Sequence, residues 1–408
     1  MESESLLPPY LVDITDYLAK DEPALWDWFT SEKIKSEYAD EVRLSLLKST
    51  YRIDHESQPE LYSSTQKIAE SFGVESVVTL YQAQQSSELN ASLAYIPKEP
   101  HVIFFGPLLK TLQPEEIEAI VGHELHHFVL WEMDDQRYFI ANQILSAMEQ
   151  DRSADDSHYE SARLFSLYTE IFCDRGALRA TNNLDVTISA LVKMITGLDK
   201  VSPGSYLEQA TEILEKQQSG SENQSHPESF LRTKALEVWS KEKDNSTVSD
   251  LIRGTLQLDR LDLIDKTQFS NLTFKLINSI LQYSWMQTES VMAHARQFFH
   301  DINAPEKTSD NRLDDQNLKT LSELIKVSAK DVRDYFCYIL LDFSVVDKNL
   351  DEAPLAAGIL ISKKLKILPR FSEIAKKELK MTKKKFDALE SSAADLISSL
   401  DGKGNAHE

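Results

Sequence analysis

Apolar residues recur at helical spacing along one central stretch of the chain, as a buried helix requires. Just before them, the segment 113–116 places a proline at the first helical position and acidic residues near the positive end of the helix dipole. The pattern predicts a buried helix that begins near Pro114. Its apolar positions are Ile117, Ile120, Val121, Phe128, Val129 and Trp131.

The pattern changes from helical to extended in the region before this helix. An amphipathic segment at 61–72 predicts a helix. Three runs rich in β-branched and aromatic residues then predict strands at 76–83, 89–96 and 101–105. A short helix at 108–112 leads into the central helix. Together these elements predict a small α+β unit.

The rest of the chain alternates between helical patterns and polar breaks, and its last residues, 391–408, predict a frayed tail. The overall prediction is therefore a mostly helical α+β fold with a small edge β-sheet, followed by an all-α C-terminal domain. The helical patterns lie at 138–148, 160–180, 186–198, 206–217, 227–239, 321–327, 332–346, 354–363 and 371–379.

The composition excludes several classes of partner. The 408 residues contain 66 Asp and Glu against 44 Lys and Arg, and the net charge of −22 repels nucleic-acid phosphates and anionic membrane surfaces. Two cysteines give no disulfide framework and suit a reducing compartment. The acidic N-terminus lacks a secretory pattern, and the longest apolar runs are too short to span a bilayer. We therefore expect a soluble, cytoplasmic protein with no nucleic-acid partner and no membrane span.

The central helix also contains an HExxH motif, formed by His123, Glu124 and His127. On a helix, a step of four residues places both histidines on one side, about 6 Å apart, which suits tetrahedral zinc. Glu124 can then act as a general base on metal-bound water. The alternative is an accidental match with histidines that pack in the core. Burying so many polar groups without a metal would be costly, which favours zinc.

A second polar pair lies on the apolar helix predicted at 160–180. Glu170 and Asp174 are four residues apart there, and an isolated buried carboxylate is expensive unless it has a partner. One interpretation is a salt bridge from Glu170 to Arg175 or Arg163. The other makes Glu170 the third zinc ligand and Asp174 an acceptor that orients one ligand imidazole.

A third motif follows the first two along the chain. His226-Pro227 follows the ExxxD pattern of Glu170 and Asp174, and Arg232 stands six residues after the histidine. With HExxH before them, these motifs resemble the HtpX-like and CAAX prenyl protease family of zinc metallopeptidases, which are of the gluzincin type. The resemblance covers roughly residues 60–240.

The resemblance implies one zinc ion, Zn²⁺, held by His123, His127 and Glu170, with Asp174 behind the ligands. Zinc lowers the pKa of a bound water to about 7, and Glu124 takes the proton and later passes it to the leaving amine. The implied function is that of a zinc-dependent endopeptidase, a hydrolase acting on extended or unfolded protein segments.

The resemblance also implies roles around the substrate. His226 and Arg232 are expected to stabilise the tetrahedral oxyanion or hold it in place. Asn90 and Ala91 match the family's Asn-Ala strand, and this strand is a candidate edge for pairing with an extended peptide.

Two residues depart from the family pattern close to the motifs. His126 stands where Gly or Ser is usual, and at three residues from His123 it could in principle coordinate the metal. Cys173 replaces a usual Ala and would be liable to oxidation near the site. Many relatives are embedded in membranes, and this chain has no such spans.

Three domains are predicted. Residues 1–55 form an N-terminal helical segment that packs on the catalytic domain, 56–240 form the zincin-like metallopeptidase domain, and 241–408 form a helical domain that serves interaction or regulation. The competing function is a metal-binding but proteolytically silent regulatory protein, in which this last domain carries a protein partner.

The C-terminal domain contains a local reversal of charge. The simpler interpretation is a solvated helix face, and the alternative is a docking surface for an acidic partner or for the acidic half of the protein itself. The basic residues are Lys363, Lys364, Lys366, Arg370, Lys376, Lys377, Lys380, Lys383, Lys384 and Lys385.

Overall fold

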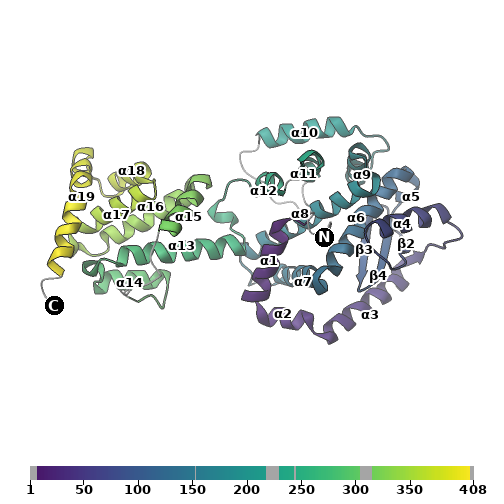
Figure 1. Ribbon diagram of the computed structural model, residues 1–408, viewed down its shortest axis with the longest axis horizontal. Coiled ribbons are helices and arrows are strands. Elements are labelled where there is room, and N and C mark those ends of the chain that lie inside the picture. The colour runs from purple at the N-terminus through teal and green to yellow at the C-terminus, as the bar shows by residue number, and fades with distance from the viewer. Residues whose placement is uncertain (1–6, 152, 217–228, 243–244, 304–314, 405–408) are drawn as a thin grey trace. The chain divides into compact units, whose positions relative to one another are not determined.

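The chain divides into two compact units, Met1–Gly254 and Thr255–Glu408 (Figure 1). The structure is a computed structural model that describes residues 7–151, 153–216, 229–242, 245–303 and 315–404. The first unit reaches beyond the domain boundary expected at 240, because helix α12 (Asn245–Arg253) packs on α11 (Ser229–Glu242) within it.

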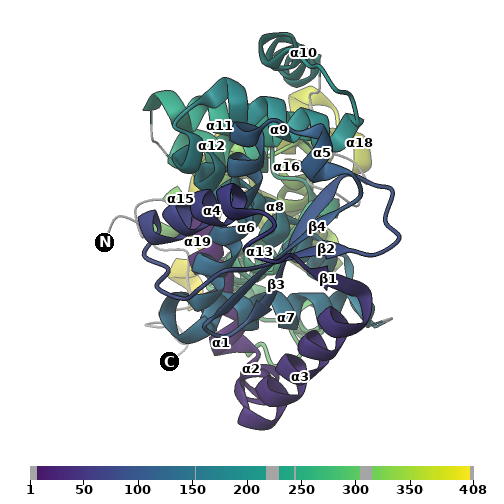
Figure 2. The ribbon, with the colours of Figure 1, turned by 90° about the vertical axis from the view of Figure 1, so that its right-hand side faces the viewer.

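The first unit contains a four-stranded sheet with the order β1-β2-β4-β3 (Figure 2). β2 and β4 are parallel, whereas β3 and β4 form an antiparallel hairpin in which Asn90 lies opposite Phe105. β3 therefore lies at an edge of the sheet and pairs with β4 alone among the described strands. The strands are β1 (Thr50–Arg52), β2 (Thr79–Ala83), β3 (Asn90–Ile96) and β4 (Glu99–Phe105).

The sequence anticipated three of these strands but not their full extent. β2 begins at Thr79 rather than at 76, and the short strand β1 comes from the N-terminal segment that was expected to be helical. β1 exists because its backbone pairs with β2, with Thr50 opposite Ala83. Three residues carry too little periodicity to predict a strand from the sequence.

Helices make up the rest of the first unit, and α6 and α8 lie against each other at its centre. α1 packs on α7 and α8, and α2 packs on α7. The remaining helices of this unit are α1 (Pro9–Asp21), α2 (Pro23–Thr30), α3 (Glu32–Ser49), α4 (Pro59–Ser71), α5 (Leu108–Thr111), α6 (Pro114–Glu132), α7 (Arg137–Gln150), α8 (Asp156–Thr181), α9 (Leu184–Thr196) and α10 (Pro203–Lys216).

Helix α6 is fixed at both of its ends. At its start Gln113 and Glu116 form a capping box, which satisfies backbone groups that a helix end leaves free. At its far end the Glu132 carboxylate accepts hydrogen bonds from the Tyr95 hydroxyl at 2.7 Å and from the Lys98 backbone at 3.1 Å. Tyr95 and Lys98 belong to the β3–β4 hairpin, so these hydrogen bonds fix the position of the edge strand relative to the helix.

A buried ion pair joins α9 to α6. The Lys193 ammonium lies 2.7 Å from the Glu116 carboxylate, and Ser189 donates a further hydrogen bond of 2.7 Å to it. Burial alone would raise the pKa of Glu116, but these partners outweigh burial and lower it. Because both charged side chains are buried, this contact fixes where α9 lies relative to α6.

The close approach of α6 and α8 depends on two glycines. Gly122 faces Ala180, and Gly176 faces the His126 ring. His126 is fully buried, packed edge-on against Phe72 and tilted against Phe172, and neither ring nitrogen has a hydrogen-bond partner among the described residues. Burial lowers the pKa of His126 to about 3, so the ring packs as a neutral group.

Replacing Gly176 by Ala is expected to destabilise the first unit by about 1–3 kcal/mol, because the added methyl group would overlap the His126 ring and push the helices apart. Thermal and urea unfolding of the full chain measure the effect. Gly204→Ala on α10 is the matched control, since nothing lies near its added methyl group. An unchanged midpoint for Gly176→Ala would contradict the close packing described here.

The second unit is built from helices around one hydrophobic core, in which Phe336, Ile359 and Phe371 are fully buried. The last helix continues to Gly404, so the frayed tail predicted at 391–408 is wrong for most of that segment. The helices are α13 (Leu263–Leu281), α14 (Glu289–Phe298), α15 (Asp315–Val327), α16 (Lys330–Val345), α17 (Ala353–Lys364), α18 (Leu368–Glu378) and α19 (Lys383–Gly404).

Part of the basic cluster on α17–α19 forms ion pairs inside this unit. Arg370 binds Asp334 through two hydrogen bonds of 2.6 Å. Two further pairs join Lys363 to Glu390 and Lys385 to Glu352. The cluster therefore contributes to the contacts between neighbouring helices.

The predicted fold class is confirmed: a mostly helical α+β unit with a small sheet is followed by a helical unit. None of the helices that the structure describes is both long and apolar enough to cross a membrane.

Candidate metal centre and adjoining cleft

The three residues predicted to bind zinc meet at one point. His123 and His127 lie on α6, and Glu170 lies on α8 with its carboxylate next to both imidazoles. The Nε2 atom of His123 lies 3.4 Å from one carboxylate oxygen of Glu170, and Nε2 of His127 lies 3.5 Å from the other. Ligands arranged tetrahedrally around zinc at 2.0–2.1 Å are about 3.3–3.4 Å apart. The two nitrogen–oxygen distances are therefore close to the separation of neighbouring ligand atoms around a zinc ion.

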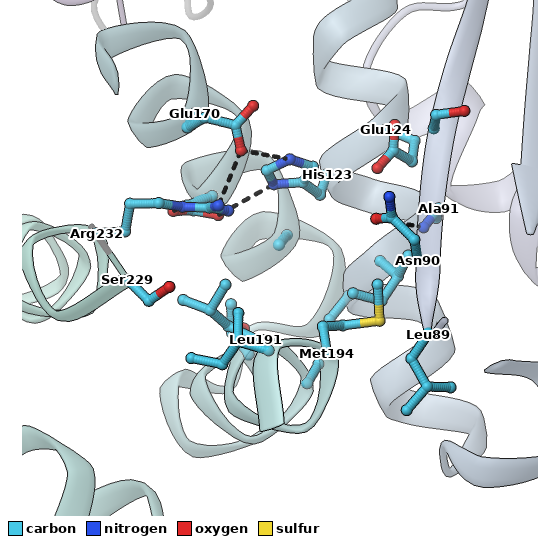
Figure 3. Close-up of a pocket in the computed structure, with 18 of the residues that line it drawn as sticks. Leu89, Asn90, Ala91, His123, Glu124, Glu170, Leu191, Met194, Ser229 and Arg232 are labelled. Carbon is cyan, nitrogen blue, oxygen red and sulfur yellow. Dashed lines mark hydrogen bonds and ion pairs between the residues drawn. The ribbon is translucent and has the colours of Figure 1, made fainter. Parts of the chain in front are cut away.

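Asp174 lies on the other side of the His123 ring. Its carboxylate is 3.0 Å from Nδ1 of His123, which leaves Nε2 to face Glu170 (Figure 3). Burial lowers the pKa of His123, but the hydrogen bonds and charges of Asp174 and Glu170 outweigh it and raise that pKa to about 10. A carboxylate behind the ligand imidazole fixes the ring orientation and makes Nε2 a better donor to a metal.

Arg232 on α11 bridges the two carboxylates. Its guanidinium donates to both oxygens of Asp174, at 2.8 and 2.6 Å, and lies 2.9 Å from Glu170. Burial alone would raise the pKa of Glu170, but Arg232 and the histidines hold it well below its usual range. The resemblance implied that Arg232 acts on an oxyanion. Here its guanidinium is engaged with the carboxylates, which suits a positioning role.

The salt-bridge alternative for Glu170 named the wrong arginines. Arg163 binds Glu160 on its own helix, and Arg175 donates to Asn245. Neither forms an ion pair with Glu170.

The two residues that depart from the family pattern, His126 and Cys173, lie in different places. His126 packs between α6 and α8 rather than toward the metal centre. Cys173 is fully buried, and its sulfur lies within 4.8 Å of ligand atoms on His123 and His127. Burial raises the pKa of its thiol well above the usual value.

A cleft of about 1100 Å³ opens beside the metal centre, bounded by β3, α6, α8, α9 and α11. Glu124 lines it although the side chain is mostly buried. Figure 3 shows Asn90 and Ala91 entering the same space from β3, and the Asn90 side-chain oxygen accepts a 2.9 Å hydrogen bond from the Ala91 backbone. His226 lies outside the residues that the structure describes.

One wall of this cleft was not predicted from the sequence. α9 contributes Leu191, Met194 and Ile195, which face the cleft or the solvent beside it. The available signal was the helix pattern at 186–198, which has more apolar positions than one buried face needs.

The family model described as Peptidase family M48 matches residues 55–240. This part of the chain belongs to peptidase family M48. It is therefore a metallopeptidase domain, a hydrolase that uses a metal ion to cleave protein substrates. The match does not single out the HtpX-like or CAAX prenyl protease branch. No curated protein and no solved structure matches the chain.

Proposed function

We propose that the protein is a zinc-dependent endopeptidase that cleaves extended or unfolded segments of other proteins. The observation that carries this proposal is the convergence of His123, His127 and Glu170, at the distances given above, in a cleft that also contains Glu124. Two imidazoles, one carboxylate and a nearby second carboxylate are the donor set and the base of a zinc hydrolase.

In this proposal a bound zinc ion supplies Lewis-acid chemistry that makes water acidic enough to react near neutral pH. Glu124 accepts a proton from the attacking water and donates it to the leaving amine. Asp174 keeps the His123 ring in one tautomer and orientation. Arg232 holds the carboxylates of Glu170 and Asp174 in place. His226 is assigned to the oxyanion on the resemblance alone.

The edge strand β3 is the proposed binding site for the substrate backbone. Its outer edge carries backbone groups that have no strand partner in the described sheet, and Asn90 and Ala91 lie on it next to the cleft. An extended peptide can add to such an edge through main-chain hydrogen bonds, largely independent of its sequence. Most backbone groups of a folded protein are already paired within it, which favours unfolded or extended segments as substrates.

Metal analysis together with a cleavage assay tests the proposal. The purified protein is expected to contain one zinc ion per chain and to cleave unfolded casein. A strong chelator should abolish the cleavage, and added zinc should restore it. A protein that binds zinc at this site but cleaves no unfolded substrate would support the alternative of a silent regulatory protein.

A further inference from the structure

The floor of the cleft next to the metal centre is made of small side chains. Ala119 from α6, Ala177 from α8 and Ala190 from α9 pack together, and all three line the cleft. Each of these side chains ends at Cβ, so none of them fills the space above the floor. Together with the cleft volume of about 1100 Å³, this leaves room for a larger side chain from another molecule.

Apolar side chains form part of the walls above this floor. Leu191 and Met194 come from α9 and Leu89 lies just before β3, and Figure 3 shows all three around the space below Glu124 and Asn90. Leu191 is nearly buried, whereas Leu89 and Met194 are half-exposed. Apolar surface that stays in contact with water loses the free energy that burial would give, so such a surface in a cleft marks a binding site.

The charges around the cleft disfavour an acidic occupant. Apart from the residues of the metal centre and Glu124, the charged side chains that line it are Glu88 and Asp199, both exposed. The whole first unit, residues 1–254, has 43 Asp and Glu against 22 Lys and Arg. An acidic substrate side chain would lose hydration against the apolar walls and would also meet this negative field.

We propose that this part of the cleft is a specificity pocket that takes a bulky apolar side chain, such as Leu, Met or Phe, from the substrate residue adjacent to the cleaved bond. The proposal rests on the proposed endopeptidase function and names the feature that selects its cleavage sites. The contact between Lys193 and Glu116 supports it, because the buried ion pair fixes α9, and with it Leu191 and Met194, against the metal-bearing helix.

The first test uses the zinc-loaded full chain. Mass spectrometry of digested casein locates the cleavage sites, and synthetic peptides based on one site then carry Leu, Ala or Asp at the residue on either side of the bond. At one of the two positions, kcat/KM is expected to be at least tenfold higher for Leu than for Ala and lowest for Asp. Equal values for Leu and Asp at both positions would contradict the pocket.

The second test changes the wall itself. Met194→Lys is expected to lower kcat/KM at least tenfold for the Leu peptide and to raise it for the Asp peptide, because the wall then carries a positive charge. Leu198→Lys is the matched control, since Leu198 is exposed just after the end of the same helix and does not line the cleft. Equal effects of the two variants would contradict the assignment of Met194.

Binding separates failure of the pocket from failure of the proposed function. Fluorescence anisotropy of labelled peptides with zinc-loaded Glu124→Gln protein measures the preference without cleavage. If neither casein nor the peptides are cleaved but the Leu peptide binds at least tenfold more tightly than the Asp peptide, the pocket stands and the endopeptidase proposal fails. If the peptides are cleaved but neither kcat/KM nor binding differs between the Leu and Asp peptides, the endopeptidase proposal stands and the pocket fails.

Discussion

Glu124→Gln protein is expected to keep its zinc and to lose peptide cleavage, with kcat lowered by about 10²–10⁴-fold or more. The amide is nearly the same size as the carboxylate, so the helix and the ligands His123 and His127 should stay in place. The amide cannot accept a proton from water near neutral pH. The effect should therefore fall on kcat, with little change in peptide affinity.

Zinc content by elemental analysis and steady-state kinetics on a casein-derived peptide measure this outcome. Glu118→Gln is the matched control, because Glu118 lies on the same helix but does not line the cleft. It loses the same charge and should keep its activity. If zinc-loaded Glu124→Gln protein hydrolyses the peptide at the wild-type rate, another group serves as the base.

The helix that carries HExxH was predictable because its signals are local. A capping sequence, an apolar face and two histidines four residues apart all lie within α6, and the structure has the helix where these signals place it. The helical position of Glu170 was predictable for the same reason. Its meeting with the histidines was expected from the resemblance and not from local signals, because it depends on how closely α6 and α8 approach each other.

The arginine that pairs with Glu170 could not be predicted from residues near it in the sequence. The sequence offered Arg163 and Arg175, which are near Glu170 along the chain, and the actual arginine is Arg232 on a different helix. Ion pairs between separate helices depend on tertiary packing, and a single sequence contains no direct signal for them. The resemblance drew attention to Arg232 but assigned it to the oxyanion.

The position of the His126 ring and the formation of β1 also depend on tertiary contacts. Spacing alone allowed His126 to coordinate a metal, and only the glycine at position 176 on the facing helix explains why its ring packs between helices instead. β1 is too short to have a pattern and exists through its pairing with β2. In both cases the deciding partner is distant in sequence.

Glu170→Gln protein is expected to lose most of its zinc affinity, and with it all cleavage. The substitution removes the charged ligand, and it also leaves the half-buried Arg232 with Asp174 as its remaining carboxylate partner. Asp174→Asn should weaken zinc binding less, by about 10–100-fold, because Asp174 acts through the His123 ring rather than on the metal. The order of zinc affinity is then wild type, Asp174→Asn, Glu170→Gln.

Competition with a chromophoric chelator gives these affinities directly, without any assay of activity. Glu160→Gln is the matched control: Glu160 lies on the same helix and also pairs with an arginine, Arg163, but it is not part of the metal centre. The loss of the Glu160 carboxylate should leave zinc binding unchanged. A metal ligand acts on the ion directly, so Glu170→Gln protein must bind zinc more weakly than Asp174→Asn protein. The reverse order would show that Glu170 is not a zinc ligand and that His123 and His127 have a different third partner.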